Sequence, residues 1–402
     1  AGTAEGVGSV GAEFRMKKIL YISTSDPEDK SSGGAQRSRF LYQALRAQGE
    51  VYTIIPVSMP SLERVDEDRK IEWICLDRRH TFRWALQRLF NRSFPLLVCP
   101  FYARNLPDRL RRDGDFDCVV VRYTQWASYF AAWRIAPLLI DIDDSPIEFY
   151  DTVMAPRCRS GLKRSLNRWL LQRWCRWIYR KATGGWIANA DQVGAIEGIK
   201  LKYLPNLAMP APEGFTFDRE KENFLLTVGY LGYAPNYEGV DQFIEESWPL
   251  LHAAKPELSY YVVGKDCPAE LKEKWSSVAG VKVLGFVDDL EALYESCLMT
   301  VAPVYSGSGT CIKVIESLLR GRICVAAPFA LRGIDRMHIQ DANGLCEASS
   351  SEAFIAKIAS YCEQPEQLKM HESNARVFAT SYFAYQQFED AVADVLINLK
   401  AV

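Results

Sequence analysis

The stretch LMTVAPVYSGSGTCIKVIESLLRGRICVA, residues 298–326, decides the fold. It contains two short strand-like runs, 298–302 and 322–326, separated by a Gly/Ser loop and a helical segment over 311–320. Gly321 follows the helical segment, as glycine commonly does where a helix ends. Apolar strands that alternate with helices are typical of a doubly wound parallel sheet. The stretch therefore predicts an α/β domain.

The same alternation extends in both directions and falls into two series. Pro205, Pro210, Pro212 and Gly214 lie between the series and indicate a linker. Strands are expected at 18–23, 51–55, 72–76, 118–121, 138–142, 185–188 and 202–204 before the linker, and at 224–229, 258–263 and 281–284 after it. We therefore expect two Rossmann-like domains, with ligands bound where the carboxyl ends of their strands face a central cleft.

Composition excludes several classes of protein. The 402 residues are 48% hydrophobic and 24% charged, as in a soluble protein of two domains, and the net charge of −2 gives no bias toward nucleic acid. Eleven scattered cysteines without a CxxC pair favour a reducing cytosol over disulfides or zinc. No apolar run approaches the about 18 residues that span a bilayer. Residues 1–15 lack a signal-peptide core and are expected to be a tag remnant or a disordered lead, with Met16 as a plausible start.

The loop before the helical segment has the chemistry of a diphosphate site. Gly307 and Gly309 allow the backbone to approach a ligand closely, and a helix N-terminus offers free N–H groups and a partial positive charge. Lys313 adds a cation one turn into the helix, and Glu316 follows on the same face, where a carboxylate could accept both hydrogens of a ribose diol. Gly/Ser loops and Lys–Glu pairs are also common on ordinary helix surfaces, so spacing alone leaves both interpretations open.

Residues 307–326 resemble the C-terminal signature of the retaining GT-B glycosyltransferases of the GT4-like "group 1" family, roughly G-S-G-T-x-x-K-x-x-E. Other blocks resemble the same family in the same order: 189–191, 205–206, 228–240 with its Pro-Asn and Gly, and 285–289. The N-terminal half matches more loosely, at 33–34 and 141–145. The resemblance covers nearly all of the C-terminal half.

This resemblance implies a GT-B fold in three parts. Residues 16–212 would be the acceptor domain, 213–380 the donor domain, and 381–402 a helix that returns to the N-terminal domain. The implied reaction moves a sugar, with retention of configuration, from a nucleotide-diphosphate sugar to a hydroxyl of a glycan or lipid-linked saccharide, as in polysaccharide or glycoconjugate synthesis. A UDP-sugar is the first candidate donor, and no metal or other cofactor is expected.

The resemblance also assigns residues to the donor. Glu316 would hold the ribose hydroxyls, and Lys313 would face the diphosphate or the sugar. Backbone N–H groups of the loop would face the diphosphate, and two residues after a strand would line the base pocket. The full donor-binding set is Gly34, Gly229, Asn236, Phe286, Val287, Ser308, Gly309, Thr310, Lys313 and Glu316.

Two departures from the family pattern concern charge. Ser308 stands where many members carry a glutamate, and the loop 229–239 lacks the basic residue that many members have there. The diphosphate then needs positive charge from elsewhere. Besides Lys313, we consider Arg37, projecting across the cleft from the N-terminal domain, and Arg332.

The N-terminal face of the cleft offers acceptor-side candidates. Gly33 and Gly34 open the first helix without the G-x-G-x-x-G fingerprint of NAD sites, and with Arg122 and Tyr123 they form the expected acceptor-side set. Asp143 and Asp144 follow a strand and could orient an acceptor hydroxyl or act as a base. The alternative is helix capping before Pro146. The expected catalytic residues are thus Lys313, Glu316, Arg37, Asp143 and Asp144.

Residues 157–181 hold nine Lys or Arg, no acidic residue, and Trp169, Trp174 and Trp177. A helix of this kind can lie on an anionic membrane, or it can simply pack its tryptophans on the sheet. A second basic, aromatic region covers 78–112. We expect a cytoplasmic protein, with contact at the inner face of the membrane as one possibility. No motif in the sequence supports binding to nucleic acid. The alternatives to a transferase are a nucleotide-sugar epimerase on the same fold, a non-catalytic sugar-nucleotide or glycan-binding subunit, and a membrane-surface scaffold.

Overall fold

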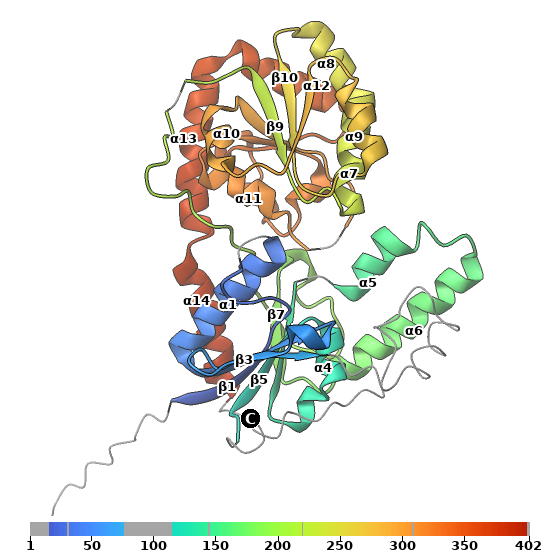
Figure 1. Ribbon diagram of the computed structural model, residues 1–402, viewed down its shortest axis with the longest axis vertical. Helices are drawn as coiled ribbons and strands as arrows, with labels where there is room; N and C mark the ends of the chain where they lie inside the picture. Colours follow the sequence, from blue (N-terminus) through green and yellow to red (C-terminus); the bar gives the residue numbers. More distant parts are fainter. Residues whose placement is uncertain are drawn as a thin grey trace, which may run out of the picture.

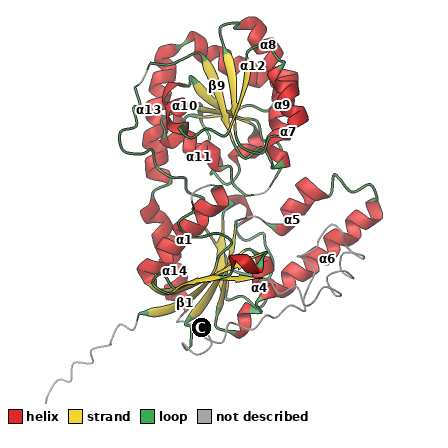
Figure 2. Ribbon diagram, viewed as in Figure 1, coloured by secondary structure: helices red, strands yellow, loops and turns green. Residues whose placement is uncertain are grey.

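The computed structural model describes residues 16–29, 32–75, 115–143, 145–218, 220–307 and 309–399. These residues form two α/β domains, each built around its own sheet and one above the other in Figure 1. Figure 2 shows the helices gathered around the sheets. The predicted fold class, two Rossmann-like domains, is confirmed. The predicted region 78–112 lies outside the described residues.

The N-terminal sheet has the strand order β3-β4-β2-β1-β5-β6-β7-β8, and its neighbouring strands run parallel except for β3 and β4. Its strands are β1 (Lys17–Ile22), β2 (Gly49–Val57), β3 (Arg64–Asp66), β4 (Ile71–Cys75), β5 (Cys118–Arg122), β6 (Leu138–Ile142), β7 (Gly184–Ile187) and β8 (Leu201–Tyr203). Its helices are α1 (Gly33–Gln48), α4 (Thr124–Tyr129), α5 (Pro146–Phe149) and α6 (Gly161–Tyr179), with short 3₁₀ or π segments η1 (Pro60–Leu62), η3 (Ala132–Arg134), η4 (Tyr150–Met154) and η5 (Ala190–Gln192).

The C-terminal sheet has the order β11-β10-β9-β12-β13-β14, and all of its pairs are parallel. Its strands are β9 (Phe224–Val228), β10 (Ser259–Val263), β11 (Val281–Gly285), β12 (Met299–Ala302), β13 (Cys324–Ala326) and β14 (Leu345–Glu347). The helices are α7 (Ala234–Gln242), α8 (Trp248–Ala254), α9 (Ala269–Ser276), α10 (Leu290–Ser296), α11 (Ile312–Leu319), α12 (Ser351–Glu363), α13 (Pro365–Tyr382) and α14 (Tyr385–Asn398), with η6 (Phe243–Ser247), η7 (Pro328–Leu331), η8 (Arg336–His338) and η9 (Asp341–Asn343).

Central strands carry apolar side chains on both faces because helices cover both faces of a doubly wound sheet. All five residues of β5 and all five of β6 are buried. Sequence reasoning did not predict β3 and β14. Each has three residues, and β3 is a largely exposed edge strand with two charged residues, so neither shows a clear apolar run.

The last helix returns to the N-terminal domain, as the fold prediction requires. Helix α13 packs on α11 in the C-terminal domain, and α14 then lies along α1 (Figure 1). The rings of Phe40 and Phe388 are 6.4 Å apart between centroids. The indole N–H of Trp186 donates to the carbonyl of Ala391 at 3.2 Å. The C-terminal segment therefore ties the two domains together.

Among the described residues, no helix is both long and apolar enough to cross a membrane. The cysteines of this part of the chain are all free thiols.

Candidate active site

A cavity of about 710 Å³ lies between the two domains. Its walls come from the N-terminus of α1 and the ends of β5 and β6 on one side, and from the ends of β9 to β12 and the start of α11 on the other. This is the edge at which parallel α/β sheets bind ligands, and the volume is in the range of small-molecule sites.

Two helix N-termini meet at this cavity. Ser32 caps α1 by accepting a hydrogen bond from the amide of Ala35 at 3.3 Å, so α1 begins at Gly33. A Cβ atom on Gly33 would approach Ile312 Cδ1 to 2.6 Å, so the two helix starts come close together here. Neither first turn contains an acidic residue. Both helix termini therefore direct partial positive charge at the same cavity.

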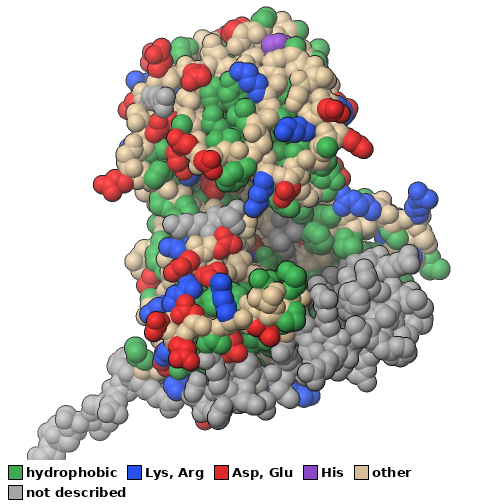
Figure 3. Space-filling view, in the orientation of Figure 1, with side chains coloured by type: hydrophobic (Ala, Val, Ile, Leu, Met, Phe, Trp, Pro, Cys, Tyr) green, Lys and Arg blue, Asp and Glu red, His purple; other side chains and the backbone are tan. Residues whose placement is uncertain are grey.

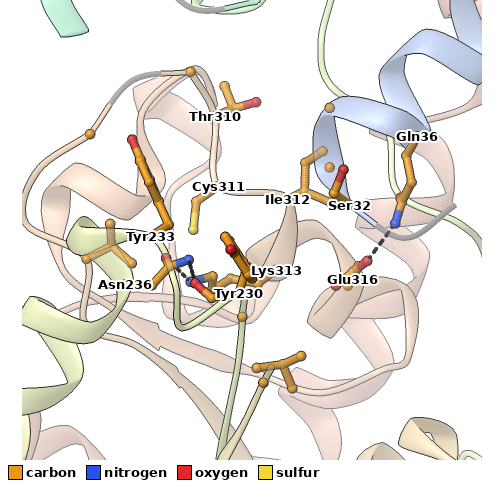
Figure 4. A pocket seen from close by; sticks show the side chains of 18 of the residues that line it. Ser32, Gln36, Tyr230, Tyr233, Asn236, Thr310, Cys311, Ile312, Lys313 and Glu316 are labelled. Carbon is orange, nitrogen blue, oxygen red and sulfur yellow. Dashed lines mark hydrogen bonds between the residues drawn. The ribbon is translucent and has the colours of Figure 1, made fainter. Parts of the chain in front are cut away.

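Lys313 lies over the loop that follows β9 (Figure 4). Its Nζ donates to Asn236 Oδ1 at 2.7 Å, and Asn236 Nδ2 donates to the carbonyl of Tyr230 at 2.9 Å. A Cβ atom on Gly229 would lie 2.9 Å from Lys313 Nζ, so the lysine lies close against this loop. Three residues of the predicted donor set, separated by up to 84 positions, are thus brought together in the cavity wall.

Glu316 also faces the cavity. Burial raises the pKa of its carboxyl group, and the hydrogen bond from Gln36 and the nearby Arg320 partly counter this rise. Arg320 itself is held by Glu291, with 2.7 Å between Nε and Oε2. The carboxylate is therefore kept in place away from bulk water, where hydrogen bonds to a ligand hydroxyl are strong.

The far end of the cavity is lined by Phe286 and Val287 after β11 and by Lys265 after β10. Phe286 is 71% exposed, so its ring is free to cover a flat ligand. Lys265 is a lining residue that sequence reasoning missed; it makes no ion pair with any other described residue. Its place directly after Gly264 at a strand end was the signal available in the sequence.

The prediction that Arg37 projects across the cleft is wrong. Its side chain is fully buried, and Nη2 lies 2.6 Å from Asp141 Oδ1. The guanidinium also donates to the carbonyl of Leu204 at 3.0 Å and to Asn206 Oδ1 at 2.8 Å. All of its donors point into the N-terminal domain, so it cannot supply charge to a bound diphosphate. Its neighbour Gln36 reaches the cavity instead.

Arg122 likewise does not line the cavity, contrary to the acceptor-side prediction. It is fully buried, and its Nη2 lies 2.7 Å from Asp143 Oδ2. Tyr123 and Asp143 do line the cavity, together with Gly33 and Gly34. Tyr123 has a φ of 66°, which is costly for a bulky side chain and is typical of functional sites.

Asp143 sits in a set of hydrogen bonds that joins the domains. Burial alone would raise its pKa, but Arg122, Arg37 and a hydrogen bond from Asn206 outweigh burial and hold it below the usual value. Asn206 Nδ2 lies 2.8 Å from Asp143 Oδ1 and 2.6 Å from Thr310 Oγ1 in the C-terminal domain. Asn206 belongs to the block 205–206 that resembles the family, but the sequence analysis did not assign it to the site.

The third candidate cation, Arg332, lines the cavity. Its guanidinium donates to Glu148 of the N-terminal domain and, at 3.0 Å, to the carbonyl of Gly309. Thr152 donates to the carbonyl of Gly307 at 2.5 Å. The N-terminal domain thus holds one side of the Gly-rich loop directly through Thr152 and the other side indirectly, through the contact of Glu148 with Arg332. The predicted site residues Ser308 and Asp144 lie outside the described residues.

Within the described ranges, no group of three or more His, Cys, Asp or Glu side chains is arranged to hold a metal ion.

The chain is similar to known proteins in part of its sequence and in its fold. Residues 222–364 match the family model described as Glycosyl transferases group 1. No curated protein matches the chain in sequence.

Solved structures resemble the chain over almost its full length. Sucrose-phosphate synthase from Thermosynechococcus elongatus is 14% identical, with a TM-score of 0.68 over 96% of this chain and 99% of that one. HepE from Anabaena, solved with UDP-glucose, is 14% identical, with a TM-score of 0.59 over 95% and 99%. WaaG, a glycosyltransferase involved in lipopolysaccharide biosynthesis, is 16% identical, with a TM-score of 0.60 over 94% and 99%. The chain therefore has the GT-B fold, and residues 222–364 of its C-terminal domain are similar to the glycosyl transferases group 1 family.

Proposed function

We propose that this protein is a glycosyltransferase that moves a sugar from a nucleotide-diphosphate sugar to a hydroxyl of a glycan or lipid-linked saccharide, with retention of configuration. The observation that carries the proposal is the meeting of Lys313, Glu316 and two helix N-termini in one cavity between the domains. Lys313 supplies a cation for the diphosphate, and Glu316 supplies a hydrogen-bond acceptor for the ribose hydroxyls. The helix N-termini supply free N–H donors. These are the groups that bind a nucleoside diphosphate.

We propose one orientation of the donor in the cavity. Glu316 takes the ribose hydroxyls, Lys313 and the helix termini take the diphosphate, and Phe286 with Val287 covers the base. The sugar then lies toward Gly309 and Thr310. A UDP-sugar is the first candidate, since the fold neighbour HepE was solved with UDP and with UDP-glucose.

The acceptor enters from the side of Tyr123 and Asp143. The lowered pKa of Asp143 makes it a poor proton acceptor, so it is suited to orienting a hydroxyl rather than to deprotonating it. We therefore favour attack on the same face as the leaving diphosphate. The acceptor oxygen bonds to the anomeric carbon, the bond to the diphosphate breaks, and the hydroxyl proton passes to a phosphate oxygen. Lys313 and the helix termini stabilise the charge that develops on the diphosphate, without a metal.

The arm formed by residues 146–179, which comprises α5, η4 and α6, suits a lipid-linked acceptor. Leu162 is 83% exposed and Trp169 51% exposed, whereas Trp174 is buried against the sheet. Lys and Arg side chains gather with hydrophobic ones on this arm in Figure 3. We propose that the first half of α6 lies on the anionic membrane face that carries the acceptor, while its second half belongs to the core.

A thermal-shift screen with UDP, GDP, ADP and dTDP tests the donor assignment. A nucleotide present at 100 times its Kd adds about 2.7 kcal/mol of stability, which is easily seen as a higher Tm. No shift with any of the four would contradict the proposal. Product analysis with and without acceptor then separates the alternatives: an epimerase converts the donor alone, and a non-catalytic subunit binds it without releasing nucleotide.

A further inference from the structure

A hydrogen-bonded amide connects the N-terminal domain to the proposed ribose site. Gln36 is the fourth residue of α1, and its side chain is 6% exposed. Its Nε2 donates to Glu316 Oε1 at 3.1 Å, as the dashed line in Figure 4 shows. Its Oε1 accepts from the backbone N–H of Met209 in the interdomain linker, also at 3.1 Å. The two partners fix the amide orientation, because the Met209 N–H requires an acceptor and the carboxylate requires a donor.

The other polar groups near Glu316 are engaged elsewhere. Lys313 Nζ donates to Asn236, and Arg320 Nε donates to Glu291. Among the described residues, Gln36 is the side chain that donates a hydrogen bond to the Glu316 carboxylate. The hydrogen bond from Gln36 to Oε1 comes from the N-terminal domain and fixes the orientation of the Glu316 carboxylate plane.

We propose that Gln36 is a positioning residue for the donor: it orients the Glu316 carboxylate for the two ribose hydroxyls and makes the ribose site complete only when α1 and the linker are docked against α11. This inference rests on the proposed nucleotide-sugar donor. It adds that recognition of the ribose is shared between the domains, although Glu316 belongs to the C-terminal domain alone.

The geometry explains why an amide suits this position. A carboxylate that receives two hydroxyl hydrogens needs a fixed plane, and an amide fixed at both ends supplies it. A charged donor such as lysine would compete with the ribose for the same oxygen, and an apolar side chain would leave the plane of the carboxylate free to rotate.

The test combines variants of the protein with variants of the ligand. Isothermal titration measures the binding of UDP and of 2′,3′-dideoxyuridine diphosphate, which lacks both ribose hydroxyls. For Gln36→Leu, which keeps the size but cannot donate, we expect UDP affinity to fall about tenfold, in line with the loss of one hydrogen bond to a charged group. The dideoxy ligand should bind wild type and variant within twofold. Gln43→Leu on the exposed side of α1 is the matched control and should change neither ligand.

A purely structural amide would give a different result. If Gln36→Leu weakens both ligands equally, or neither, the positioning role is overturned. If wild type binds no nucleoside diphosphate, both this inference and the proposed function fail. If wild type binds UDP and discriminates against the dideoxy ligand but Gln36→Leu retains that discrimination, only this inference fails.

Gln36→Glu gives a second, independent readout should Gln36→Leu fold poorly. At low pH the two carboxyl groups share one proton, and residue 36 still donates to Glu316. At higher pH both ionise at hydrogen-bond distance and repel. UDP affinity relative to wild type should therefore fall as the pH rises. A ratio that stays constant with pH contradicts the direct contact that the proposal requires.

Discussion

Arg37 and Asp141 form a fully buried ion pair, with 2.6 Å between Nη2 and Oδ1, directly behind the wall of the cavity. Asp141 also forms an ion pair with Arg122, with 3.2 Å between Oδ2 and Nε. Arg37 donates hydrogen bonds to Leu204 and Asn206 at the start of the linker. These contacts lie within the N-terminal domain, so their role is to hold the cavity wall in place.

Arg37→Met should therefore destabilise the protein rather than weaken donor binding. Removing one partner of a buried pair leaves a charge without full compensation, which costs about 3 kcal/mol. Urea unfolding at 25 °C measures this loss, and Arg37→Met/Asp141→Asn should recover part of it. The folded variant should bind UDP with wild-type affinity. A selective loss of UDP affinity at unchanged stability would instead support a direct contact with the donor.

Local spacing predicted the part of the site that lies within one segment. Lys313 and Glu316 share a helix face at the end of a loop, and this relationship depends only on helix geometry. Arg37 and Gln36 show where such reasoning ends. They are adjacent on α1, so their side chains point in directions about 100° apart, and the partners that decide their roles lie 104 residues away for Arg37 and 280 for Gln36. Only the docking of the two domains shows which of them faces the cavity.

Lys313→Met should weaken the diphosphate contact specifically. The variant loses the cation that lies between Asn236 and the proposed diphosphate, so kcat/KM should fall about 100-fold. UDP affinity should fall while the affinity for uridine, which has no phosphate, stays the same. Lys272→Met, an exposed lysine on α9, is the control and should change neither value. An equal loss for uridine and UDP would indicate a local structural defect instead.

Glu316→Gln should make the ligand-free protein more stable while removing donor recognition. Burial raises the pKa of Glu316, so the folded protein holds this proton more tightly than the unfolded chain does. Ionising the group costs stability, which falls as the pH rises through the raised pKa. At pH 7 the neutral glutamine avoids this cost, and the Tm without ligand should increase. The additional stabilisation by UDP should be much smaller than in wild type.

The opposite result for Glu316→Gln would contradict this prediction. A lower Tm without ligand, with full stabilisation by UDP, would mean that Glu316 is a structural residue. Glu291→Gln is a useful comparison, since Glu291 pairs with Arg320 beside the site.

The arm of residues 146–179 should bind anionic vesicles through the exposed first half of α6. Replacing Leu162 and Trp169 together by serine removes two exposed apolar side chains and leaves every cation of the arm in place. Co-sedimentation with vesicles that contain phosphatidylglycerol should fall several-fold, because binding scales with the buried apolar area in addition to charge.

Met370→Ser/Val377→Ser on α13 removes exposed apolar side chains of similar exposure and should leave sedimentation unchanged. Transfer to a short soluble acceptor should also be unchanged, since Leu162 and Trp169 do not line the cavity. Equal sedimentation of both double variants and wild type would rule out this surface of α6 as the membrane contact.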